Sequence, residues 1–298
     1  MASDSYVAFT AAEFRVYPFP PIEQVLEPWL KARGIVMIAG YRGIGKTFFS
    51  LSTAAAIASA GGFLGFRAPT ARSVLYVDGE MDPGETQQRM KAIEAGMFGS
   101  NPAYEGNFRY TTYALQDGGF MNLCEPKGQR RMEATLGESE VLFLDNIFTL
   151  CRPLNGSTHN DAESWLDMQE WLLRLRAKGK TVVLIHHTGK PDKESGQTSQ
   201  FGTSMREVIL DATLLLERLP MRQKGMKIVA EKARGFEAWD PAIKAKVVWT
   251  DAPVGPCTLE RLDSADIADK VAELREEGLP DAEIAKRLRM NLRTMGGL

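Results

Sequence analysis

The chain has 298 residues, 44% of them apolar and 25% charged, and its formal net charge is −2. These values are typical of an intracellular globular enzyme with one large domain and a smaller addition. The near-neutral charge excludes a global basic field that would attract nucleic acid, so any DNA contact must come from local basic loops.

Cysteine usage and hydropathy indicate a cytoplasmic protein. The three cysteines (Cys124, Cys151 and Cys257) are scattered, and their spacing does not match a metal site. We therefore expect reduced thiols in a reducing compartment. No apolar run approaches the roughly 18 residues of a membrane span, and the N-terminus lacks a signal-peptide core. We expect no membrane partner and a cytoplasmic location.

The first 33 residues form an N-terminal segment with several prolines, including Pro18 and Pro28. Proline restricts its own backbone and that of the preceding residue, which predicts an extended segment. Trp29 and Leu30 are expected to pack on the core.

Strand and helix patterns alternate along residues 34–188. Such alternation, with strands that are almost continuously apolar, predicts an α/β fold with a mostly parallel sheet covered on both faces. The expected strands are 34–40, 73–80, 107–112, 141–147 and 181–188, and the expected helices are 47–60, 83–97 and 162–177.

The pattern changes after Gly202. Three strand-like runs with short connections predict an antiparallel extension of the sheet over residues 212–219, 226–234 and 244–250. The main domain is therefore expected to span residues 34–250. Residues 251–263, with proline and glycine, are interpreted as a linker, and residues 264–298 as a small helical tail.

Residues 40–47 read Gly-Tyr-Arg-Gly-Ile-Gly-Lys-Thr, a complete G-x-x-x-x-G-K-[ST] phosphate-binding loop. In such loops the glycines let backbone N–H groups surround the phosphates, the lysine reaches the β- and γ-phosphates, and the hydroxyl holds Mg²⁺. The loop stands between an apolar strand and a helix-forming run, as the motif requires. We expect ATP and Mg²⁺ as cofactors, with nucleotide contacts from Gly40, Arg42, Gly43, Ile44, Gly45, Lys46, Thr47 and Phe48.

Acidic residues end two of the apolar strands. Asp145 ends 141–144 and is expected to hold the Mg²⁺ together with Thr47; the alternative is an aspartate that caps the next turn. Asp78 and Glu80 stand at the end of 74–77, where a carboxylate could orient and polarise the attacking water. Strand alternation places these two acids on one face, so spacing alone leaves the choice open.

Histidines and cations end later strands. His186 and His187 end 182–185, where a polar side chain could sense the γ-phosphate; an ordinary strand-end histidine is the alternative, and zinc lacks a third ligand with matching spacing. Lys232 and Arg234 close a late strand and are expected to project to one side. They could stabilise phosphoryl-transfer charge in a neighbouring subunit, or form a solvated basic strand end.

Two polar segments, 149–161 and 189–204, follow the Asp145 and His187 strands. Loops of this length within a compact domain are usually functional or disordered. Lys190, Lys193 and Arg206 supply local positive charge and are the expected DNA contacts near the second segment.

Taken together, the motifs over residues 20–250 resemble RecA-like ATPases, specifically the RepA-type hexameric helicase branch related to DnaB-like and RecA proteins. The resemblance rests on Trp29 ahead of the loop strand and on five further segments: GGFLG at 61–65, VLYVDGE at 74–80, LDNI at 144–147, LIHHTGK at 184–190 and EKARG at 231–235.

The resemblance implies a RecA-like core in a ring of six subunits with ATP between neighbours. It implies that Glu80 is the catalytic carboxylate and His187 the sensor, that Lys46, Thr47, Glu80 and Asp145 act in cis, and that Lys232 and Arg234 act in trans. The loops after Asp145 and His187 would then grip single-stranded DNA in the pore. The expected activity is that of an ATP-dependent DNA helicase for replication of a plasmid, phage or other mobile element.

The tail suggests a helix-turn-helix unit, with Val271, Gly278, Asp281–Leu288 and Asn291 as landmarks and Arg293 as a possible DNA contact. Two alternatives to the helicase stay open. One is a RecA-like recombinase that pairs DNA strands. The other is an ATP-dependent switch, in transcription control or phage defence, that acts through residues 264–298.

Overall fold

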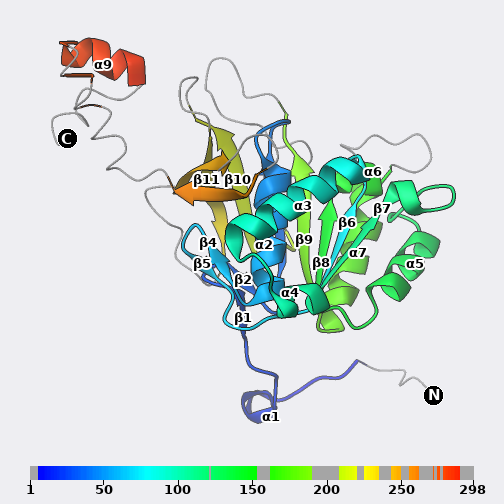
Figure 1. Cartoon of the computed structure of the whole chain (residues 1–298). Helices are drawn as coiled ribbons and strands as arrows, with labels where there is room; N and C mark the ends of the chain where they lie inside the picture. Colours follow the sequence, from blue (N-terminus) through cyan, green and yellow to red (C-terminus); the bar gives the residue numbers. More distant parts are fainter. Residues whose placement is uncertain are drawn as a thin grey trace.

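A nine-stranded sheet forms the centre of the computed structural model, which describes residues 6–120, 122–152, 162–189, 208–219, 225–234, 243–249, 255–261, 271, 274–275 and 278–288. The strand order is β13-β12-β11-β10-β3-β9-β8-β6-β7 (Figure 1). Six neighbouring strands are parallel: β10 (Ala212–Arg218), β3 (Ile35–Gly40), β9 (Thr181–His187), β8 (Val141–Asp145), β6 (Val74–Asp78) and β7 (Phe108–Thr112). The expected α/β class and mostly parallel sheet are confirmed.

The antiparallel extension is also confirmed, but its first expected strand, β10, runs parallel to β3, and β13 is a further strand that was not expected. It comprises β11 (Met226–Ala233), β12 (Ile243–Trp249) and β13 (Cys257–Arg261). The linker predicted over 251–263 is therefore wrong, because β13 pairs with β12 inside it. Cys257 and Leu259 alternate inward and are 2% and 7% exposed, a strand pattern that the neighbouring prolines and glycine obscured.

Helices cover both faces of the sheet. One face carries α2 (Lys46–Ser59), α3 (Pro83–Met97) and α4 (Pro102–Asn107), and Figure 1 shows α2 and α3 lying across it. The other carries α5 (Pro126–Leu136), α6 (Ile147–Leu150) and α7 (Ala162–Ala177). Successive strand residues join opposite cores, as in β3, where Ile38 packs with the α2 side and Met37 with the α7 side.

Three helices that cover the sheet, α4, α5 and α6, were not anticipated. The α4 and α5 helices each begin with proline, which suits the first helical position. Only Met132 and Leu136 give α5 an apolar side, too few for a clear helical period.

The N-terminal segment is folded in part, so the expectation of an extended chain is wrong there. It contains α1 (Ala11–Val16), with a capping box between Thr10 and Glu13, and a hairpin of β1 (Gln24–Leu26) and β2 (Leu30–Lys31). Trp29 and Leu30 are buried, as expected. A second hairpin, β4 (Gly62–Phe63) and β5 (Phe66–Arg67), follows α2, and the short helix η1 (Tyr113–Leu115) follows β7.

The described part of the tail has its own small core. It contains α9 (Asp281–Leu288), and Ile284 and Ala285 of this helix pack with Val271 and Leu274. The third helix expected near Asn291 lies outside the described residues. No helix in the described ranges is long and apolar enough to cross a membrane.

Candidate nucleotide-binding and hydrolysis site

The phosphate-binding loop joins the carboxyl end of β3 to the amino end of α2. Gly43 and Gly45 have φ of 71° and 105°, in the left-handed region that glycine adopts most easily. A Cβ at Gly45 would also lie 2.6 Å from Cε of Met226, a buried residue of β11. The backbone conformation therefore favours glycine at position 45, and a side chain there would also displace the end of the Met226 side chain.

Lys46 is buried, at 6% exposure, in the first turn of α2. Its Nζ donates to the carbonyls of Gly40 at 2.8 Å and Tyr41 at 3.1 Å. Burial lowers the pKa of Lys46 to about 8, although Asp145 and Glu80 act in the opposite direction. In the part of the chain that the structure describes, no carboxylate lies within ion-pair distance of Nζ.

These features fit a nucleotide triphosphate. A buried ammonium held by neutral carbonyls is stabilised by any anion that reaches it. Among the described residues, the backbone amides of Gly43, Ile44 and Gly45 donate no hydrogen bond. Such amides at a helix N-terminus suit phosphate oxygens.

Asp145 lies at the end of β8, opposite Asp78 in the register of β6, and is 5% exposed. Tyr76 Oη donates to Asp145 Oδ2 at 2.6 Å and lies 2.9 Å from Ser50 Oγ, which donates to the Lys46 carbonyl at 2.8 Å. Burial raises the pKa of Asp145 to about 7, against the hydrogen bond from Tyr76. Tyr76 connects Asp145 to Ser50, which lies about one helical turn after Thr47 in α2. A carboxylate in this position is suited to a divalent cation, and the cation would favour the ionised form of Asp145.

Glu80 and Asp78 have different environments, although alternation predicted a shared face. The β6 strand ends at Asp78, so the period of two does not extend to Glu80. Asp78 is 1% exposed and accepts from the amides of Glu80 and Met81, from Thr86 Oγ1 and from Tyr110 Oη. Its carboxylate oxygens are thus engaged in local structure.

The Glu80 side chain is 45% exposed and joins a cluster formed by three strand ends. Glu80 Oε2 accepts from Asn146 Nδ2 and lies 3.1 Å from His187 Nε2, while Asn146 Nδ2 lies 3.0 Å from the same ring nitrogen. The hydrogen bond from His187 lowers the pKa of Glu80. An ionised Glu80 accepts from Asn146, and it accepts from His187 in the tautomer that carries its proton on Nε2.

Asn146 had no role in the sequence analysis. Its Oδ1 accepts from the amides of Phe148 and Thr149 at the start of α6, which fixes the amide so that Nδ2 is directed to Glu80. The sequence signal for this role is an asparagine, a preferred N-cap residue, directly after the Asp145 strand.

Comparison with known families agrees with this geometry. Residues 4–193 match the family model described as AAA domain. The chain belongs to this family. It is therefore a P-loop ATPase, which binds nucleotide and usually Mg²⁺. A search of curated proteins found no match.

In this AAA domain protein the two late cations lie far from the loop of their own chain. Ala233 pairs with Ala212, which pairs with Val36, four residues before Gly40. The end of β11 is thus about 13 Å from Gly40 along the strands. Arg234, just past β11, donates to the Val208 carbonyl at 3.3 Å.

Lys190, Lys193, Arg206 and Arg293 lie outside the described residues. The three cysteines are buried and form no disulfide with one another, and within the described ranges no group of three acidic, histidine or cysteine residues could hold a metal.

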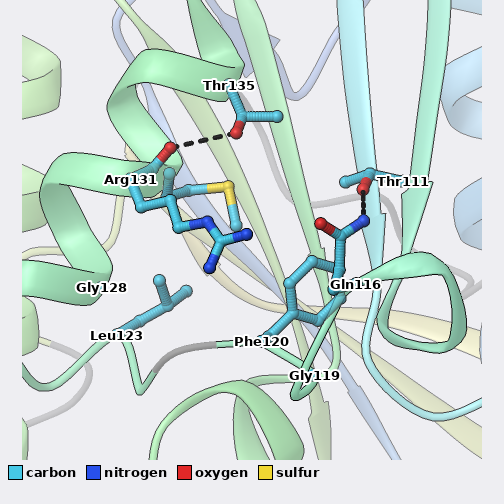
Figure 2. A pocket seen from close by; sticks show the side chains of 9 residues that line it. Thr111, Gln116, Gly119, Phe120, Leu123, Gly128, Arg131 and Thr135 are labelled. Atoms are coloured by element: carbon cyan, nitrogen blue, oxygen red, sulfur yellow. Dashed lines mark hydrogen bonds between the residues drawn. The ribbon is translucent and has the colours of Figure 1, made fainter.

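A small cavity of about 30 Å³ lies between α5 and the segment after β7, lined by residues that include Gln116 and Arg131 (Figure 2). This volume suits a water molecule or two and is too small for a nucleotide.

Proposed function

We propose that this ATPase is the subunit of a ring-forming motor that translocates on single-stranded DNA and unwinds duplex DNA, as a replicative helicase of a plasmid, phage or mobile element does. ATP would lie at the phosphate-binding loop, between neighbouring subunits of a homo-hexamer. The position of Lys232 and Arg234 is the observation that carries this proposal. Two cations at the end of the sheet opposite the loop can act on phosphates only if a second copy brings its nucleotide to them.

The chain's own residues divide the chemistry. Lys46 and the loop amides bind the phosphates, Thr47 and Asp145 would hold Mg²⁺, and Glu80 would accept a hydrogen bond from the attacking water. When bound, Mg²⁺ neutralises charge on the phosphate oxygens. Asn146 and His187 hold Glu80 in place and connect its position to the segment after β9, which would contact DNA.

The first test is the ATPase rate with and without single-stranded DNA, together with particle mass in a non-hydrolysable ATP analogue. The proposal expects strong stimulation by single strands and a mass of six subunits, followed by strand displacement. A monomer or dimer without stimulation would overturn it.

Lys46→Ala is expected to lose hydrolysis because it removes the buried cation, and wild-type turnover in this variant would contradict the site.

Mixing experiments test the trans role. If Arg234 acts on a neighbour's nucleotide, Arg234→Ala subunits should reduce the activity of mixed rings below the wild-type fraction. Activity proportional to that fraction would count against a role in trans. Because the Arg234 side chain donates only to a backbone carbonyl among the described residues, the variant should fold normally.

One observation favours the regulatory switch as a second candidate. The tail residues around α9 pack in a cluster of their own, as expected for a unit that binds a partner or duplex DNA. A monomer or dimer whose ATPase ignores single strands, and whose duplex binding is lost on removal of residues 264–298, would support the switch. Helical filaments in micrographs would instead favour the strand-pairing recombinase.

A further inference from the structure

Tyr76 is a fully buried tyrosine in β6, between the strand that ends in Asp145 and β7. Its ring stacks on Phe143 of β8 and on Tyr110 of β7, with ring centroids separated by 5.5 and 6.1 Å. Aromatic neighbours on both sides leave the ring little freedom to change rotamer, because protein interiors are closely packed. The position of the Tyr76 hydroxyl is therefore set by the sheet.

The hydroxyl of Tyr76 contacts polar groups on two other elements. Its Oη donates to Oδ2 of Asp145 in β8 at 2.6 Å and lies 2.9 Å from Oγ of Ser50 in α2. Ser50 Oγ is also 2.8 Å from the carbonyl of Lys46, in the first turn of the same helix. A short series of polar contacts thus connects the helix that bears Lys46 and Thr47 to the carboxylate of Asp145.

The Asp145 carboxylate depends on this one donor. Among the described residues, Tyr76 Oη is the only group that donates a hydrogen bond to it. Asp145 is 5% exposed, so solvent replaces a lost donor poorly. An ionised carboxylate can accept about four hydrogen bonds. Asp145 therefore keeps unused capacity for a cation or its water ligands, while Tyr76 holds one of its oxygens.

We propose that Tyr76 is a positioning residue for Mg²⁺, which fixes the orientation of the Asp145 carboxylate relative to Thr47 in α2. Mg²⁺ requires near-octahedral geometry, so a carboxylate that leaves its orientation loses affinity for the ion. Groups that orient a metal ligand typically change metal affinity about 10- to 100-fold when they are removed. The inference rests on the proposed Mg²⁺ role of Asp145 and Thr47 and is independent of the proposed ring.

Tyr76→Phe tests this role, because it removes the hydroxyl and keeps the aromatic stacking. Binding of a fluorescent, non-hydrolysable ATP analogue to the full chain is measured at equilibrium, in EDTA and in a series of Mg²⁺ concentrations. The variant should need about tenfold more Mg²⁺ for half of the Mg²⁺-dependent gain in affinity. Its affinity for the analogue in EDTA should equal that of the wild type, because Lys46 and the loop amides are unchanged.

Tyr104→Phe is the matched control. Tyr104 of α4 is also buried and donates to a carboxylate, that of Glu94, at 2.7 Å. It lies near the carboxyl end of α2, where Asn107 of the same helix α4 donates to the Ala58 carbonyl, and so away from the phosphate-binding loop. This variant should lose a comparable hydrogen bond and keep the Mg²⁺ requirement of the wild type.

Asp145→Asn separates failure of this inference from failure of the proposed site. A higher Mg²⁺ requirement in both Asp145→Asn and Tyr76→Phe supports the positioning role. A higher requirement in Asp145→Asn alone overturns the inference and leaves the proposed Mg²⁺ ligand in place. A wild-type requirement in Asp145→Asn overturns both. Equal weakening of Tyr76→Phe in EDTA and in Mg²⁺, or an equal effect of Tyr104→Phe, also overturns the inference, because the hydroxyl would then serve only the fold.

Discussion

At the scale of single residues, the chemistry of the site depends on how burial sets ionisation. Asp145 and Lys46 are both buried at the same sheet edge. Burial raises the pKa of Asp145 and lowers the pKa of Lys46, so it favours the neutral form of each side chain. The nucleotide and Mg²⁺ that the loop is built for would reverse both shifts. If Asp145 holds Mg²⁺ as proposed, its ionisation is expected to be coupled to metal binding.

Asp145→Asn tests this linkage in the ligand-free chain. The native pKa of Asp145 is raised to about 7 from an unfolded value of 3.8. Native protein therefore binds more protons than unfolded protein between these values, and the contribution of Asp145 to the free energy of unfolding is present at low pH and lost as pH rises to about 7. The total loss is at most roughly 4 kcal/mol. Asp145→Asn should lack this decline, as measured by denaturant unfolding of both proteins from pH 4 to 8.

The neutral variant keeps an acceptor for Tyr76, so the comparison isolates the charge. If wild type and Asp145→Asn show parallel pH dependence, Asp145 ionises normally in the native state and the argument from burial fails.

At the scale of elements, the site is made where parallel strands end. The carboxyl ends of β3, β6, β8 and β9 lie at one edge, with Gly40 opposite His187 and Asp78 opposite Asp145. Each strand stops where a turn or helix begins, and these terminations direct the polar side chains. Asn146 has two roles, because the oxygen of its side-chain amide caps α6 and the nitrogen binds Glu80.

Substitution of Asn146 can separate these two tasks. Asn146→Asp keeps an oxygen that caps α6 but removes the donor to Glu80 and places a second carboxylate beside it, so stability should change little while ATP hydrolysis falls at least tenfold. Asn146→Ala should lose hydrolysis and also about 0.5–2 kcal/mol of stability. Thermal unfolding and single-turnover hydrolysis, measured on both variants, check this.

Equal hydrolysis in wild type and Asn146→Asp would show that Asn146 serves only the α6 cap. The expected contrast between the variants is the specific sign of a positioning role, since a cap alone would affect stability first.

At the scale of the whole molecule, the sheet extends well past the parallel core. The β13 strand pairs with β12 and packs closely against α3, where a Cβ on Gly96 would lie 2.1 Å from the Cys257 carbonyl oxygen. The described tail residues instead pack among themselves. The boundary of the folded core thus follows Arg261 and not residue 250.

Truncation tests this boundary. A chain ending at residue 262 should retain the thermal midpoint of the full chain within a few degrees, because β13 is preserved. A chain ending at residue 250 exposes the edge of β12 and the α3 surface that β13 covers, and it should unfold at a lower temperature or aggregate. Equal midpoints for the two truncations would contradict the assignment of β13 to the core.

The local elements with strong patterns could be predicted from the amino-acid sequence alone. The phosphate-binding loop, the α3 and α7 helices, the buried strands and the antiparallel direction of β11 and β12 follow from glycine spacing, helix starts and apolar runs, which act over a few residues. The weaker elements α4, α5 and β13 were not predicted, since packing on the sheet stabilises them more than their own composition does.

Long-range packing determines which polar groups come into contact. Asp78 and Glu80 are two residues apart, yet one is enclosed by Tyr110 and Thr86 and the other faces His187. Tyr76 and Asp145 are far apart in the sequence and share a hydrogen bond. Contacts between residues that are distant in the sequence depend on strand order, which comes from long-range packing and cannot be obtained from spacing along the chain.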